Sequence, residues 1–235
     1  MKSSICRVLL VVLLCIIPTV LFSQDELLRK QIEYAMRGKN AIVGIAAVFD
    51  GKDTLVINGH YRYPTMSVYK FFLALAVLDH LDKNKLTLEE KILVTKSDML
   101  PNTYSPLRDK HPNGGIKLTV GELLKYTISQ SDNNACDILF RYVGGTAQVN
   151  QYIAGLDVGN IEVTATEEEM HRTFEDQYLN WTEVMAAAKA MNAFLSRKLF
   201  APQFKKFLEQ ILIETTTGEN KIKALLPKEV IVGHK

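Results

Sequence analysis

The sequence predicts an α+β protein with an antiparallel sheet, formed by the N- and C-terminal segments, and an all-helical domain. Two β-rich runs, 42–49 and 54–58, lie near the start and a third, 230–235, ends the chain, with helical periodicity between them. The chain has 235 residues, 47% hydrophobic and 23% charged, enough for a substantial core. Its net charge of +2 gives no reason to expect a nucleic-acid partner.

Residues 1–23 have the organisation of an export signal. Lys2 and Arg7 precede an uncharged run over residues 8–23 that ends in a small residue, the expected cleavage point. That run of 16 residues is shorter than the ~20 needed for a membrane-spanning helix. We therefore expect a periplasmic or secreted protein with no stable membrane anchor after cleavage. Cys136 is then the one remaining cysteine, so no internal disulfide is expected.

The first elements after the signal are a helix and a hairpin. Residues 25–37 carry apolar side chains at helical spacing. The runs 42–49 and 54–58 follow, and Asp50-Gly51 between them is typical of a tight hairpin turn.

Helices dominate the middle of the chain. A long apolar helix is predicted from Ser67, and Thr119 with Glu122 has the spacing of a capping box that opens a second helix. A third helix is expected over 134–143, ending at Gly144-Gly145.

Residues 157–180 are acidic and have few apolar anchors, which indicates a long loop of the kind that is usually functional. We expect a sheet-containing α/β subdomain from residues 24–62 and 213–235, incomplete at its C-terminal end. A helical subdomain over 63–212 would carry the loop.

Three short motifs could carry chemistry. In Ser67-x-x-Lys70 the two side chains share a helix face, so an amine could activate the hydroxyl, although this pattern also arises by composition. Ser131-Asp132-Asn133 could contact a substrate or could simply cap a helix. Lys235, ending the last β-rich run, could bind a carboxylate or could protect a sheet edge.

In this order the three motifs resemble those of class A β-lactamases and penicillin-binding proteins. The resemblance extends to Arg62-Tyr-Pro-Thr-Met-Ser67 before the nucleophile and to Tyr104-Ser105-Pro106, which is similar to a loop with an aromatic at the pocket mouth. Residues 217–227 resemble the segment before the third active-site strand, and Val232-Gly-His-Lys235 the start of Lys-Thr-Gly.

The acidic loop resembles the Ω loop of class A β-lactamases. Glu167-Glu-Glu-Met-His171 is similar to Glu-x-x-Leu-Asn, which makes Glu167 the general base by resemblance, with Glu168 and Glu169 as alternative registers. His171 replaces the family Asn. The Arg–Asp pair that closes the loop is replaced by Ala165 and Asn180, so the loop must be held differently, as in the extended-spectrum subgroup typified by the PER and VEB enzymes.

This resemblance implies a serine hydrolase that opens the β-lactam amide of penicillins and cephalosporins and so confers antibiotic resistance. Ser67 would attack, with Lys70 or Glu167 as acylation base, and Ser131 would protonate the leaving nitrogen. Glu167 would drive deacylation. Tyr104, Asn133, His171 and Lys235 would complete the substrate site. No metal or cofactor is expected, and the protein should be a monomer.

Two alternatives remain open from the sequence. The first is a penicillin-binding protein or D-alanyl-D-alanine peptidase, with the same nucleophile and no Glu-driven deacylation. The second is an inactive fragment, because the family's strand continues beyond the Lys that corresponds to Lys235 and is followed by two more strands and a helix. We expect a chain truncated at that Lys to fold poorly and to have negligible activity by itself.

Overall fold

The computed structural model describes residues 24–235, so the expected signal peptide lies outside the described residues. The chain divides into two units, and the described part of the first, 24–43, contains helix α2 (Gln24–Met36), as predicted over 25–37. The second unit, 44–235, contains every other described element. Within the described part of the chain, no helix combines the length and apolarity needed to cross a membrane.

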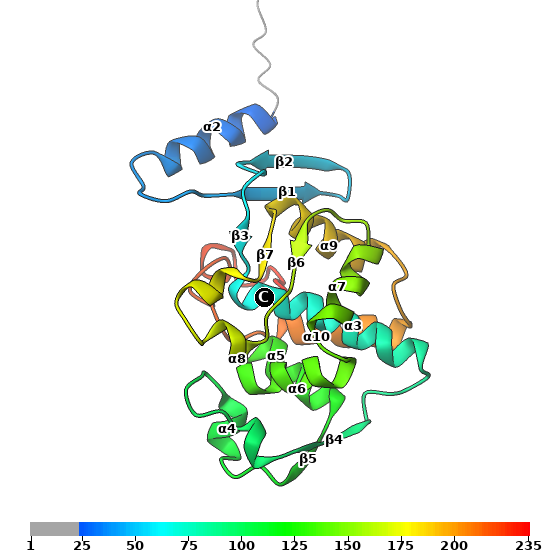
Figure 1. Ribbon diagram of the computed structural model, residues 1–235. Helices are drawn as coiled ribbons and strands as arrows, with labels where there is room; N and C mark the ends of the chain where they lie inside the picture. Colours follow the sequence, from blue (N-terminus) through cyan, green and yellow to red (C-terminus); the bar gives the residue numbers. More distant parts are fainter. Residues whose placement is uncertain (1–23) are drawn as a thin grey trace, which may run out of the picture. The chain divides into compact units, whose positions relative to one another are not determined.

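The second unit begins with the predicted hairpin. Strands β1 (Ile45–Phe49) and β2 (Asp53–Ile57) pair antiparallel. Asp50 and Gly51 have φ angles of 48° and 71°, the left-handed pair that a type I′ turn requires. Helix α9 (Val184–Ser196) packs against β1 (Figure 1).

Helix α3 (Tyr69–Lys83) is the centre of the hydrophobic core. Every residue from Tyr69 to Leu78 is buried, so this helix is enclosed on all sides. Three further helices pack against it (Figure 1): α5 (Val120–Ser129), α6 (Asn133–Val143) and α7 (Thr146–Gly155).

Two helix ends lie where the sequence predicts them. Thr119 and Glu122 form a reciprocal capping box at the start of α5. Helix α6 ends at Gly144, whose φ of 96° is the left-handed conformation that favours glycine.

Short elements between α3 and α5 in the sequence form a small excursion that contacts α6. They are β4 (Lys91–Val94), η2 (Lys96–Asp98), α4 (Pro106–Lys110) and β5 (Ile116–Thr119), with β4 and β5 paired antiparallel.

A three-stranded sheet joins the segment before α3 to the base of the acidic loop. Its order is β3 (Tyr63–Pro64), β7 (Trp181–Thr182), β6 (Ile161–Glu162), with antiparallel pairs. Between β6 and β7 the loop contains α8 (Glu167–Met170) and the short η3 (Glu175–Tyr178). The loop is therefore ordered and anchored beside the entry to α3.

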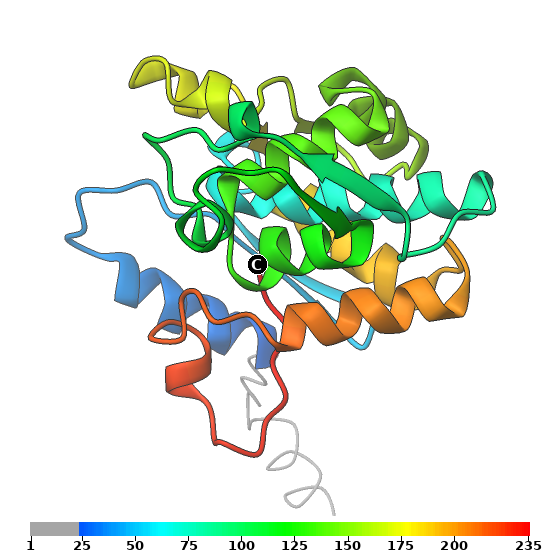
Figure 2. The same cartoon turned by 90° about the horizontal axis from the view of Figure 1, so that it is seen from below.

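The predicted strand over 230–235 is wrong. After α10 (Pro202–Ile213) and η4 (Lys223–Leu225), the chain runs past the end of α10 without strand pairing (Figure 2). The His234 amide donates to the Leu212 carbonyl at 3.2 Å, and the Thr215 hydroxyl donates to the His234 carbonyl at 3.0 Å. The backbone of His234 thus forms hydrogen bonds with the end of α10 and the residues after it, where a strand would pair with another strand. Within residues 24–235 the β1–β2 sheet has two strands.

Candidate active site

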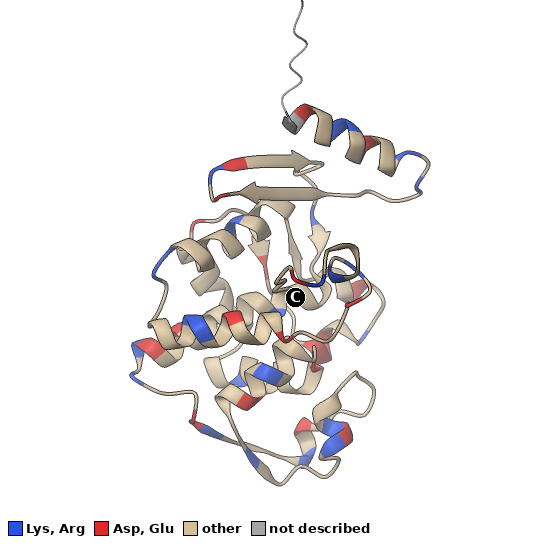
Figure 3. Ribbon diagram, turned by 180° about the vertical axis from the view of Figure 1, so that it is seen from behind, with Lys and Arg blue, Asp and Glu red and all other residues tan. Residues whose placement is uncertain are grey.

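Acidic and basic residues are interspersed along the described part of the chain (Figure 3). Most ion pairs have a well-exposed partner, as in Lys83–Asp79 and Lys125–Glu214. The pair formed by Lys70 and Glu167 differs, because both side chains are buried. A buried ion pair has lost the hydration of two charges, so other polar groups around it must help to stabilise those charges.

Ser67 lies immediately before α3, in the 3₁₀ turn η1 (Met66–Val68). Met66 has a φ of 44°, a strained backbone conformation for a non-glycine residue. Thr65 holds this segment in place, since its amide and its hydroxyl donate to the Asn180 carbonyl at 2.9 and 3.2 Å. The serine is thus fixed by the base of the acidic loop.

Lys70 lies on the first turn of α3 and is fully buried. Its Nζ donates to the Ser131 carbonyl at 2.9 Å and to Asn133 Oδ1 at 2.5 Å, and lies 2.9 Å from Glu167 Oε1. An ammonium has three donors, and all three are engaged. The hydrogen bond suggested by the Ser67-x-x-Lys70 spacing is therefore not made, and among the described residues the Ser67 hydroxyl has no hydrogen-bond partner.

The three residues of the motif Ser131-Asp132-Asn133 make different contacts. Asp132 caps α6 by accepting from the Ala135 amide at 2.8 Å, and it also accepts from the Ser105 hydroxyl at 3.0 Å. Ser131 has a φ of 58°, and its carbonyl and the Asn133 amide oxygen both reach Lys70. The capping interpretation is correct for Asp132, whereas its two neighbours face the candidate site.

The three consecutive glutamates have three different environments. Glu167 is buried against Lys70, and Glu168 is exposed. Glu169 is used at the start of α8, where its carboxylate accepts from the Thr166 amide at 2.9 Å and completes a capping box. Only the register predicted from the resemblance places a carboxylate beside Lys70.

Asp137 on α6 supports the start of α8. Its carboxylate accepts from the Glu167 amide at 2.7 Å and from the Glu168 amide at 2.9 Å. Burial raises the pKa of Asp137 to about 6, and the nearby negative charge of Glu167 acts in the same direction. This role could not be predicted from the sequence, because an Asp within a helix gives no sign of which distant loop will contact it.

Asn180 closes the acidic loop. Its Oδ1 accepts from the Thr164 and Ala165 amides at 2.8 and 2.9 Å, and its Nδ2 donates to the Ala165 carbonyl at 2.8 Å. The loop therefore is held by an amide side chain bound to backbone, in place of the Arg–Asp ion pair that Ala165 and Asn180 cannot form.

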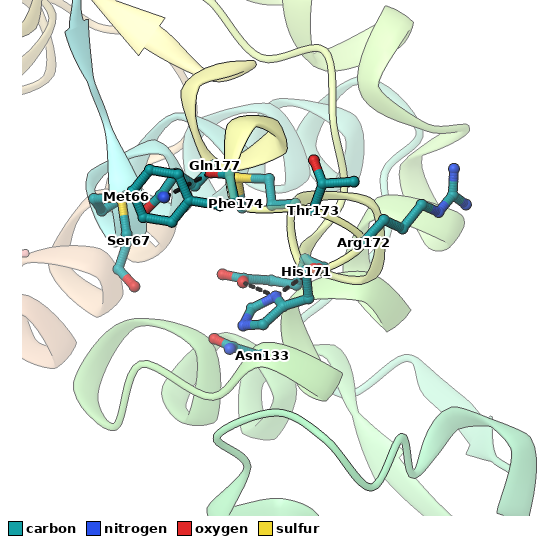
Figure 4. A pocket seen from close by; sticks show the side chains of 10 residues that line it. Met66, Ser67, Asn133, His171, Arg172, Thr173, Phe174 and Gln177 are labelled. Carbon is teal, nitrogen blue, oxygen red and sulfur yellow. Dashed lines mark hydrogen bonds and ion pairs between the residues drawn. The ribbon is translucent and has the colours of Figure 1, made fainter.

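Two cavities meet at Ser67. The first, of about 460 Å³, lies between the serine and the acidic loop (Figure 4). Of the predicted site residues it is lined by Ser67, Asn133, Glu167 and His171. The second, of about 420 Å³, is lined by Ser67, Ser131 and Lys235 together with residues of the 217–223 segment. The exposed Tyr104 side chain lines neither cavity. The backbone carbonyl of Tyr104 accepts a hydrogen bond from the backbone N–H of Asn133 at 3.0 Å.

Lys235 and His171 are oriented by backbone carbonyls. Lys235 Nζ donates to the carbonyls of Thr127 and Ile128, at 2.8 and 2.9 Å, near the end of α5. Burial, and secondly the positive charge of Lys70, lower the pKa of Lys235 to about 7. His171 Nδ1 lies 2.6 Å from the Glu167 carbonyl, and a carbonyl only accepts, so Nδ1 carries a proton; in the neutral imidazole Nε2 is then the acceptor.

Among residues 24–235, neither Cys136 nor the histidines belong to a cluster that could hold a metal ion. Cys136 is buried beside the Tyr69 hydroxyl, 3.3 Å from its sulfur, and burial raises the pKa of the thiol well above its usual range. Residues 24–235 contain no group of three His, Cys, Asp or Glu side chains arranged to hold a metal ion.

Comparison with known proteins identifies the family. The model of the "Beta-lactamase enzyme family" matches residues 27–235. A β-lactamase of Bacteroides uniformis is 43% identical over 94% of this chain and 75% of its own length. The β-lactamase VEB-1 of Pseudomonas aeruginosa is 40% identical over 99% of this chain and 79% of its own.

Solved structures agree with this assignment. The TLA-1 extended-spectrum β-lactamase superposes with a TM-score of 0.87 at 46% identity, covering 90% of this chain and 77% of that one. A class A β-lactamase from Bacteroides cellulosilyticus gives 0.86 at 45% identity, covering 90% of this chain and 76% of its own. The chain belongs to the β-lactamase enzyme family and has the α+β fold of its class A serine enzymes.

Proposed function

We propose that this protein hydrolyses the β-lactam amide of penicillins and cephalosporins through an acyl-enzyme on Ser67. The observation that carries the proposal is the position of Glu167, buried beside Lys70 and lining the same cavity as Ser67. A carboxylate there can activate water against an ester on the serine, which separates a hydrolase from an enzyme that is merely acylated. The activity would protect its host from β-lactam antibiotics.

Acylation begins when the Ser67 hydroxyl attacks the lactam carbonyl. Either Lys70 or Glu167, the latter through a water, accepts the hydroxyl proton. The backbone N–H of Ser67 is one donor to the developing oxyanion, an interaction whose loss typically costs ~10²–10³ in rate. Because Lys70 is engaged by three acceptors, a proton must be redistributed within this network before Lys70 can act as a base.

The second cavity suits the ring nitrogen and the carboxylate of the substrate. Ser131 delivers a proton to the nitrogen as the amide bond breaks. Lys235 attracts the carboxylate. Because Lys235 and Ser131 line the same cavity, the same positive charge lowers the cost of deprotonating Ser131. Asn133 contacts the substrate's acylamino side chain from the first cavity.

Deacylation uses Glu167 and His171. Glu167 takes a proton from a water, which attacks the Ser67 ester, and the serine leaves with its proton restored. His171 Nε2 accepts a hydrogen bond from that water, the task of the family Asn. The bond from Nδ1 to the Glu167 carbonyl sets the tautomer that this task requires.

The same proposal includes the finer expectations from the sequence. The protein acts as a monomer in the periplasm or outside the cell, after removal of residues 1–23. The closure of its altered Ω loop by Asn180 supports grouping it with the extended-spectrum enzymes, and the proposed reaction requires no metal or cofactor.

Covalent labelling tests the proposal. The chain extended beyond Lys235 with the family's C-terminal segment, which serves as the wild type, should form a Ser67 adduct with fluorescent penicillin that disappears within seconds. Its Ser67→Ala variant should form none while retaining its circular dichroism spectrum. Labelling of Ser67→Ala would overturn the choice of nucleophile. A wild-type adduct that persists for hours would instead support the penicillin-binding alternative.

A further inference from the structure

Two apolar side chains stand exposed on the wall of the first cavity. Phe174, on the acidic loop, is 71% exposed, and Met66, beside the nucleophile, is 52% exposed. Both line the cavity together with Ser67, as Figure 4 shows. Single exposed apolar residues are common on proteins, but apolar side chains gathered on a concave wall beside reactive groups mark a binding surface.

The ring of Phe174 is positioned by its neighbours on the loop. Its centroid lies 6.0 Å from that of Tyr178, with the planes at 68°, an edge-to-face arrangement. Gln177 Nε2 donates to the Phe174 carbonyl at 2.6 Å. The ring is therefore held at the rim without being buried, and most of its surface is available to a ligand.

The charges around this wall also restrict what it can bind. Glu167 is paired with Lys70 behind the cavity, and Arg172 extends away from Phe174 in Figure 4. Arg172 also lines the cavity, but a carboxylate placed against Phe174 and Met66 would lose water without reaching its guanidinium. An aromatic ring there would exchange water for contacts with the Phe174 ring and the Met66 thioether.

We propose that Phe174, together with Met66, forms a specificity surface for the aromatic acyl side chain of the substrate. The inference rests on the proposed function, because that side chain is attached next to the carbonyl that Ser67 attacks and must lie in the cavity that Phe174 lines. The preferred substrates are then β-lactams with an aryl group on the acylamino side chain.

A matched pair of penicillins tests the proposal. Benzylpenicillin and its acetyl analogue differ by one phenyl ring. For Phe174→Ala, kcat/KM for benzylpenicillin should fall about 3- to 10-fold, the range expected for one aromatic contact, while the acetyl analogue should change less than about twofold. Phe174→Tyr should keep the wild-type preference and Phe174→Leu should lose part of it. Leu179→Ala is the control, since Leu179 is 44% exposed on the same loop and lines neither cavity.

The outcomes separate the two proposals. An equal loss for both penicillins in Phe174→Ala would mean that Phe174 only supports the loop, and no loss for either would mean that it does not meet the substrate. Either result overturns the specificity proposal while hydrolysis by the wild type stands. Failure of the wild type to hydrolyse both penicillins would overturn the proposed function, and the specificity proposal with it.

Discussion

Lys70 and Glu167 form an ion pair with 2.9 Å between Nζ and Oε1, and their side chains are 0% and 6% exposed. Each charge is tolerated in the interior because the other neutralises it. Removing one partner of such a pair typically costs about 3–5 kcal/mol, since the other charge is left buried and unpaired. The two residues should therefore be probed with variants that separate a loss of folding from a loss of chemistry.

Substitution of each glutamate in turn tests which one drives deacylation. Glu167→Ala and Glu167→Gln should both accumulate the acyl-enzyme, detectable by mass spectrometry after mixing with benzylpenicillin. Glu168→Ala should turn over normally. Glu169→Ala should lose about 1 kcal/mol of stability with the α8 capping box but keep its turnover. Trapping by Glu168→Ala would show that the register is displaced by one residue.

Substrate affinity should depend on the charge of Lys235. With its pKa lowered to about 7, the side chain is an ammonium below pH 7 and mostly neutral above it. KM for benzylpenicillin should therefore rise with pH and be about tenfold higher at pH 8 than at pH 6. Lys235→Arg keeps its charge and should remove this rise. A KM that is flat in the wild type would contradict the proposed contact with the substrate carboxylate.

The protonation of Asp137 should be visible in stability. Its pKa is raised to about 6 in the folded protein, against 3.8 for an ordinary Asp, so the folded state binds the proton more tightly than the unfolded state. The free energy of unfolding should therefore increase as the pH falls through 6, by up to about 1.4 kcal/mol per pH unit until about pH 4. That gain is lost again as the pH rises.

Asp137→Asn isolates this contribution, because the other titrating groups are common to both proteins. Urea denaturation of the two proteins at pH 4, 5, 6 and 7 gives their free energies of unfolding. That of the wild type should increase relative to that of Asp137→Asn as the pH is lowered. A difference that stays constant over this range would refute the assignment.

Loss of the Asn180 side chain should loosen the acidic loop. Asn180→Ala leaves the buried amide and carbonyl of Ala165 without their partner, at about 1–3 kcal/mol for each group, and also removes the partly buried bond from the Thr164 amide. Thermal unfolding should show a marked loss of stability, and deacylation should slow because Glu167 is carried by the same loop. Asn160→Ala, which removes an exposed bond to Glu183, should change neither.

Local patterns predicted much of this architecture. The Asp50-Gly51 turn, the capping box of Thr119 and the stop at Gly144 are each determined by a few neighbouring residues, and the structure has all three. Thr166-x-x-Glu169 is a pattern of the same kind that was overlooked. It would have assigned Glu169 to the helix start and narrowed the choice of base to Glu167 and Glu168.

Features that depend on contacts between residues far apart in the sequence could not be predicted from local patterns. The spacing of Ser67 and Lys70 allows contact, but the other acceptors around the amine decide where it points. Residues 230–235 are β-rich in composition, yet a strand forms only where another strand pairs with it. The division into a sheet-containing and a helical subdomain stays a prediction.

The closure of the acidic loop by Asn180 has a consequence for its behaviour in solution. An ion pair between surface charges weakens as salt screens it and is lost when its carboxylate is protonated. The hydrogen bonds of Asn180 join an uncharged amide to uncharged backbone groups, and the side chain is buried. The Asn180 contacts should therefore hold equally well in dilute buffer, in molar salt and in mild acid, so that neither charge screening nor carboxylate protonation opens the loop at this point.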